Sequence, residues 1–175
     1  MADKSVRLNI KRQNSPESQP YWEEFELQWR AGMNVIIALM DIACNPVNRQ
    51  GKQIPPIVYD SNCLEEACGS CAMLINGQAA MACSSLIDKL DQPMRLEPLS
   101  RFPIVRDLSV DRSILLEKRK LADQWVPIDG TYPLGPGPRI DPATQELAYP
   151  LSRCMSCCLC MEVCPRFNES THYVG

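Results

Sequence analysis

The chain has 175 residues, 45% hydrophobic and 22% charged, which suffices for one core of ordinary size or two small ones. Its formal net charge of -3 excludes a strongly basic surface, so we expect no nucleic-acid partner. Ten cysteines would suggest disulfides in an exported protein, but the start Met-Ala-Asp-Lys-Ser has no apolar signal region. The composition therefore favours a reducing, cytoplasmic setting in which the thiolates bind metal.

Residues 1 to about 105 show the pattern of a small sheet curled over one helix. Asn34 is expected to cap a helix from Val35 to about Cys44, which ends at Asn45-Pro46. The strongest turn signal is Asn76-Gly77, the centre of a predicted hairpin. Alternation and turn residues predict strands at 5–13, 21–29, 57–59, 72–75, 78–82 and 94–98. This order fits a β-grasp domain.

The second predicted domain, residues 106–175, is mainly helical. Asp111 is expected to cap a helix that runs to about Trp125. Residues 127–142 hold five prolines and three glycines, so we expect an irregular loop that lies against a partner. A short helix is expected to start at Pro150 and to lead into the cysteines that follow. The overall class is therefore α+β.

The first group of cysteines has the plant-type [2Fe-2S] spacing C-x4-C-x2-C…C. Its members are Cys63, Cys68, Cys71 and Cys83. If Asn76-Gly77 is the hairpin turn, Cys71 lies opposite Ala82, so Cys71 and Cys83 meet at the base of the hairpin. Gly69 is expected to adopt a positive φ and to let backbone N–H groups approach the sulfurs.

A structural zinc site is the alternative for these four thiolates, because Cys68-Gly-Ser-Cys71 resembles half of one. It would require both the C-x4-C opening and a second cysteine run to be accidental. Cys44, on the apolar helix, is interpreted as a small buried hydrophobe. His172, the only histidine, is interpreted as a residue of a surface loop.

The second run has the bacterial ferredoxin spacing C-x2-C-x2-C-x3-C-P. It comprises Cys154, Cys157, Cys160, Cys164 and Pro165. In this pattern the first three thiolates hold one cubane cluster and the fourth ligates a different one. Cys158 is interpreted as a bystander near the cluster. Each cluster needs further cysteines and none follows, so we expect the chain to be a fragment in which the first cluster alone has all its ligands.

No nucleophile, base and orienting group occur at a recognisable spacing, and no glycine-rich phosphate loop follows a strand. We therefore predict no catalytic residue, and a chain that transfers electrons. Three classes of function remain: an electron-transfer subunit of a membrane-associated enzyme, a soluble ferredoxin-like carrier or subunit of another flavoenzyme, and a zinc-stabilised interaction module.

The chain closely resembles the iron-sulfur subunits of succinate dehydrogenase and fumarate reductase. The resemblance rests on the two cluster signatures in this order and on the segments that join them, Phe-Pro-Ile-Val-Arg-Asp-Leu-Ser-Val-Asp at 102–111 and Ile-Asp-Gly-Thr-Tyr at 128–132. The resemblance implies a [2Fe-2S] β-grasp domain and a helical domain with [4Fe-4S] and [3Fe-4S] clusters, here incomplete. Electrons would pass from FAD in a flavoprotein catalytic subunit, through the clusters, to quinone at a membrane-anchor subunit of the cytochrome b type. The chain would then be peripheral, on the cytoplasmic face of a bacterial plasma membrane.

The family's ligand positions carry over by the motifs. Cys63, Cys68, Cys71 and Cys83 resemble the [2Fe-2S] ligands. Cys154, Cys157 and Cys160 resemble three of the four [4Fe-4S] ligands, and Cys164 resembles one of three [3Fe-4S] ligands. Arg166-Phe167-Asn168 lacks the tryptophan of ubiquinone-linked relatives, which favours menaquinone. The implied enzyme is a succinate:quinone oxidoreductase, respiratory complex II, with fumarate reductase as the alternative.

Overall fold

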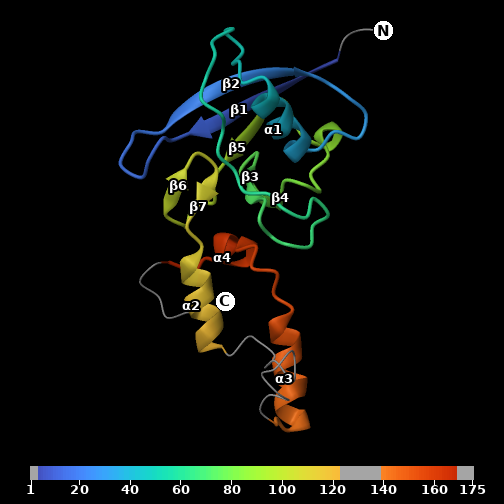
Figure 1. Ribbon diagram of the computed structural model, residues 1–175, viewed down its shortest axis with the longest axis vertical. Helices are drawn as coiled ribbons and strands as arrows, with labels where there is room; N and C mark the ends of the chain where they lie inside the picture. The colour runs from blue at the N-terminus through green and yellow to red at the C-terminus, as the bar shows by residue number, and fades with distance from the viewer. Residues whose placement is uncertain (1–3, 123–138, 169–175) are drawn as a thin grey trace, which may run out of the picture.

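The computed structural model describes residues 4–122 and 139–168. A mixed five-stranded sheet has the order β2-β1-β5-β3-β4, and the helix α1 (Val35–Cys44) packs beneath it (Figure 1). The strands are β1 (Ser5–Arg12), β2 (Tyr21–Gln28), β3 (Ala72–Ile75), β4 (Gln78–Met81) and β5 (Met94–Glu97). The predicted β-grasp arrangement is confirmed, and the structure adds that the last strand, β5, pairs parallel with β1.

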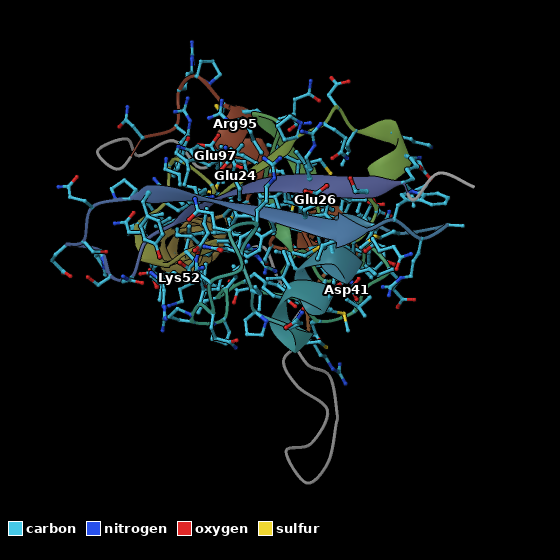
Figure 2. All side chains as sticks on the ribbon, turned by 90° about the horizontal axis from the view of Figure 1, so that it is seen from above. Glu24, Glu26, Asp41, Lys52, Arg95 and Glu97 are labelled. Carbon is cyan, nitrogen blue, oxygen red and sulfur yellow. The ribbon has the colours of Figure 1, made fainter. Side chains whose placement is uncertain are left out.

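The core lies between one face of the sheet and α1. On β1 the buried residues Val6, Leu8 and Ile10 alternate with more exposed neighbours, as a half-buried strand requires. The opposite face is charged: Glu24 and Glu26 of β2 lie 3.0 and 3.4 Å from Arg49. Figure 2, which views the molecule from the β1–β2 end, labels both of these carboxylates together with Arg95 and Glu97 of β5. On α1 the core positions are Val35, Ile36, Ala38, Leu39 and Ile42.

The hairpin β3–β4 has the predicted register, with Ile75 opposite Gln78 across the Asn76-Gly77 turn. Both turn residues have positive φ, 51° and 79°, which is why asparagine and glycine suit them. The predicted strand at 57–59 is wrong. Val58 instead donates its N–H to the Asp107 carboxylate and accepts a bond from the N–H of Leu108, so it meets a turn rather than a strand.

That turn belongs to a second, two-stranded sheet that the sequence analysis missed, β6 (Ile104–Arg106) and β7 (Ser109–Val110). It is anchored by a buried ion pair, since Arg12 of β1 donates from Nε to Asp107 at 2.9 Å. Arg12 also donates to Glu23 at 2.6 Å and to the carbonyl of Pro55. The β6–β7 turn is therefore tied to the main sheet through charged groups that are removed from water.

The helical part differs from its prediction. Helix α2 (Ser113–Leu121) starts one residue later than a helix capped by Asp111 would, after Arg112, but the Asp111 carboxylate still accepts from the Ser113 N–H at 2.8 Å. The predicted end at Trp125 lies outside the described residues. Helix α3 (Pro142–Ser152) starts eight residues before the predicted Pro150, because Asp141 caps it through the N–H of Thr144 and Pro142 occupies the first turn. Pro150 lies inside this helix. Two further short elements were not predicted, the 3₁₀ turn η1 (Ile87–Lys89) and α4 (Leu159–Val163).

Helix α4 joins the C-terminal part to the sheet domain, and lies between the sheet and the projecting helices α2 and α3 (Figure 1). Its Glu162 is buried and accepts bonds from the N–H and hydroxyl groups of Ser100 at 3.1 and 2.6 Å. Phe167 stacks on Phe102 with ring centroids 5.7 Å apart. Within the described ranges, no helix is both long enough and apolar enough to cross a membrane.

Candidate metal centre

The loop that starts at Cys63 curls so that backbone N–H groups face its sulfur atom. Leu64 and Glu66 have φ of 61° and 60°, an uncommon conformation for residues other than glycine. With these reversals, the N–H groups of Glu65, Ala67 and Cys68 donate to Cys63 Sγ at 3.5, 3.3 and 3.3 Å. Such a nest of N–H groups stabilises negative charge on sulfur.

Cys68 lies in the same nest. Its Sγ accepts from the N–H groups of Cys63 and Ser70, both at 3.5 Å, and lies 3.4 Å from the hydroxyl oxygen of Ser70. The N–H of Cys63 is the main reason that the pKa of the Cys68 thiol falls to about 6, with Ser70 contributing next. A thiol with this pKa is readily deprotonated, and the thiolate is the form that binds metal.

Cys71 and Cys83 lie at the base of the β3–β4 hairpin. Both are buried, and the N–H of Ala82 donates to the Cys71 carbonyl at 3.1 Å, as the predicted register requires. Burial raises the pKa of the Cys71 thiol to about 11, while Cys83 acts in both directions, since its backbone N–H lowers that pKa and its thiol raises it. The N-cap residue of α1 also holds this site, because Asn34 Nδ2 donates to the Cys83 carbonyl at 2.8 Å.

The four cysteines therefore form two pairs, Cys63 with Cys68 and Cys71 with Cys83. Among residues 4–122 and 139–168, no three cysteine, histidine or carboxylate side chains surround one point as ligands of a single ion would. A [2Fe-2S] cluster differs, because each of its two irons takes two thiolates. The paired thiols and the N–H groups directed at sulfur fit that group.

The second run follows α3 and leads into α4. Cys154 and Cys160 are exposed, and Cys157 and Cys164 are half-buried. Cys158 is buried among them, and burial raises the pKa of its thiol to about 12, with smaller effects of Cys157, Cys160 and Cys154. Burial also raises the pKa of the Cys160 thiol, with smaller contributions from Cys157 and Cys154. Cys44, by contrast, is exposed, so its interpretation as a buried hydrophobe is wrong.

The two cysteine runs are in direct contact. Gly69 has φ of 75°, as predicted, but it also packs against the second run: a Cβ atom there would lie 2.6 Å from the Met155 carbonyl oxygen and 2.8 Å from the Cys157 backbone. Arg112, which the sequence analysis did not single out, donates to the carbonyls of Gly69 and Ser70 at 2.7 Å. Neither contact has a sequence signal, because the partners are far apart along the chain.

A β-grasp sheet with a plant-type cysteine loop defines a ferredoxin-like iron-sulfur domain, and residues 7–117 match the family described as 2Fe-2S iron-sulfur cluster binding domain. The chain is 50% identical over 172 residues to the succinate dehydrogenase iron-sulfur subunit of Bacillus subtilis, an alignment that covers 98% of this chain and 68% of that protein. The fumarate reductase iron-sulfur subunit of an Escherichia coli strain is 27% identical over 174 residues, with the same two shares. The chain belongs to the family of succinate dehydrogenase and fumarate reductase iron-sulfur subunits.

The fold agrees with this family. A chain of the Mycobacterium smegmatis Sdh1 complex in the apo form superposes with a TM-score of 0.68 at 22% identity, and the match covers 93% of this chain and 64% of that chain. The present chain thus spans about two thirds of the length of these relatives.

Proposed function

We propose that this chain relays electrons as the iron-sulfur subunit of a succinate:quinone oxidoreductase, between a flavin-containing catalytic subunit and quinone at a membrane anchor. The observation that carries the proposal is the loop from Cys63 to Cys83, in which backbone N–H groups donate to two thiols and a hairpin base supplies two more. A bound [2Fe-2S] cluster would supply reversible one-electron uptake. The protein holds the thiolates, stabilises their negative charge and excludes water from Cys71 and Cys83.

The assignment of individual ligands follows the motifs. Cys63, Cys68, Cys71 and Cys83 hold the [2Fe-2S] cluster. Cys154, Cys157 and Cys160 contribute to a [4Fe-4S] cluster, and Cys164 contributes to a [3Fe-4S] cluster; each of these two clusters needs further ligands. The division into a [2Fe-2S] domain, 1–105, and a helical domain, 106–175, is part of the same proposal. The close approach of Gly69 to the Cys157 backbone supports electron relay between the two cysteine runs, because neighbouring centres must be close for electrons to pass.

The proposed partners are a flavoprotein subunit and a cytochrome b-type membrane anchor, with the chain peripheral on the cytoplasmic face of the membrane. Menaquinone is the proposed electron acceptor, because the triplet after Pro165 contains no tryptophan. In the structure Phe167 is buried against Phe102, while the side chains of Arg166 and Asn168 are exposed. Fumarate reduction is the second candidate activity, because the relay itself works in either direction and a fumarate reductase subunit is among the relatives.

The test is anaerobic reconstitution of the 175-residue chain with iron and sulfide, followed by metal and acid-labile sulfide analysis and by electron paramagnetic resonance of the reduced protein. We expect about two irons and two sulfides per chain at the first site, and the spectrum of a reduced [2Fe-2S] cluster. Cys83→Ala should abolish that spectrum. Cys44→Ser is the matched control and should retain it, because Cys44 is exposed on α1 and belongs to neither cysteine run.

Two results would overturn the proposal. One is a colourless protein that binds a single zinc ion through the same cysteines, which would make the site structural. The other is an unchanged [2Fe-2S] spectrum in Cys83→Ala, which would place the cluster elsewhere in the chain.

A further inference from the structure

Arg112, the residue that precedes α2, spans the first cysteine loop with its guanidinium group. Nη1 donates to the Gly69 carbonyl at 2.7 Å, and Nη2 donates to the carbonyls of Ser70 and Ala72 at 2.7 and 3.3 Å. These carbonyls belong to the short segment that connects Cys68 to Cys71 and starts β3. One side chain therefore fixes the backbone between two of the proposed [2Fe-2S] ligands.

The same side chain faces the second cysteine run. Arg112, Cys68 and Ser156 line one open cavity between the two runs. Arg112 Nε is buried and finds no hydrogen-bond acceptor within the described residues. Arg119, two turns further along α2, donates to Ser156 Oγ at 2.6 Å and fastens the helix to the second run.

We infer that Arg112 is a positioning residue that holds the first cysteine loop against the second and raises the reduction potential of the first centre. The inference rests on the proposed function. Reduction adds negative charge to a cluster, and a nearby cation stabilises the reduced form. The planar fork of arginine reaches several carbonyls at once, whereas lysine supplies a compact charge without that geometry.

The experiment uses the 175-residue chain, reconstituted anaerobically, in four forms: wild type, Arg112→Met, Arg112→Lys and Arg95→Met. Arg95 is the matched control, because it is half-exposed on the charged outer face of the sheet (Figure 2) and its loss changes the net charge equally. The midpoint potential of the [2Fe-2S] signal is measured by redox titration. Hydrogen exchange of the amides of residues 66–72 is measured in the metal-free chain.

For Arg112→Met we expect the ratio of reduced to oxidised cluster at a fixed potential to fall about tenfold, which is a shift of about 59 mV to more negative potential for a one-electron couple. In Arg112→Lys the midpoint potential should be lowered by at most half as much as in Arg112→Met, because the positive charge is retained. The amides of residues 66–72 should nevertheless exchange faster than in wild type. Arg95→Met should change neither quantity.

An Arg112→Met potential equal to wild type would overturn the inference, and so would an equal shift in Arg95→Met. If Arg112→Met holds no cluster, the metal-free measurement decides: unchanged exchange at 66–72 overturns the inference and faster exchange supports it. A wild-type chain that forms no cluster refutes the proposed function instead, and the exchange data then still test the contact of Arg112 with the loop.

Discussion

Gly69 meets two structural requirements, one on its backbone conformation and one on the space around it. Its φ of 75° suits glycine, and its missing side chain leaves room for the backbone of the second cysteine run. The first requirement could be predicted from the sequence, because a loop that directs N–H groups to sulfur needs such a turn. The second could not, because nothing in the local sequence of Gly69 identifies Met155 and Cys157 as its neighbours.

Gly69→Ala tests this contact. We expect the substitution to lower the free energy of unfolding by about 1–3 kcal/mol more than Gly77→Ala, because the new methyl group would overlap the Met155 carbonyl and force the two runs apart. Gly77 is the matched control: its φ is 79°, so the conformational strain is the same, and a Cβ there meets nothing within 4 Å. Urea unfolding of both variants gives the comparison. Equal losses would show that the loops do not press on each other at Gly69.

At the scale of elements, sequence signals predicted a helix start or a turn correctly where the bonds involved join residues that are close in the chain. The N-cap Asn34 and the Asn76-Gly77 turn are where they were predicted, because each bonds to its own neighbourhood. Predictions failed where two signals of the same kind compete. Asp141-Pro142 and Pro150 both favour a helix start, and the cap on Thr144 decides for the first. The charge-anchored β6–β7 sheet could not be predicted, because its partner Arg12 is 95 residues from Asp107.

Asn34 connects helix α1 to the proposed [2Fe-2S] site, and this connection can be tested. Its Oδ1 accepts from the Ile37 N–H and its Nδ2 donates to the Cys83 carbonyl. Asn34→Asp retains the cap and loses the donor, so α1 should remain folded while the reconstituted cluster is lost faster in air. Asn34→Ala loses both and should cost about 1 kcal/mol of stability in addition. Circular dichroism reports on the helix, and the fading of visible absorption reports on the cluster; equal fading in Asn34→Asp and wild type would contradict the role of the donor.

At the scale of the whole molecule, the main sheet, the small sheet and the segment before the first cysteine are joined by buried charge. Asp107 accepts from Arg12 Nε, from the Gln13 N–H and from the Val58 N–H, at 2.9, 3.1 and 3.0 Å. Replacing one member of such a set leaves the others buried without their partner, which costs more than the intact pair contributes.

We therefore predict that Asp107→Asn lowers the free energy of unfolding by about 3–5 kcal/mol. Glu117→Gln is the control, because Glu117 and Lys120 form an ion pair whose side chains are both 67% exposed, and the loss there should stay below about 1 kcal/mol. Chemical unfolding measures both. A loss of about 1 kcal/mol or less in Asp107→Asn would mean that the charges are not what joins the two sheets.

The central position of β5 has a consequence for the order in which the chain folds during synthesis. The strand lies between β1 and β3, and it is the last of the five to be made. Until residue 97 has left the ribosome, the β1–β2 and β3–β4 hairpins have no common partner strand, although all four cysteines of the first loop have already been synthesised. During that interval the thiols are exposed on an open chain. The site takes shape only when a segment that carries none of its ligands completes the sheet.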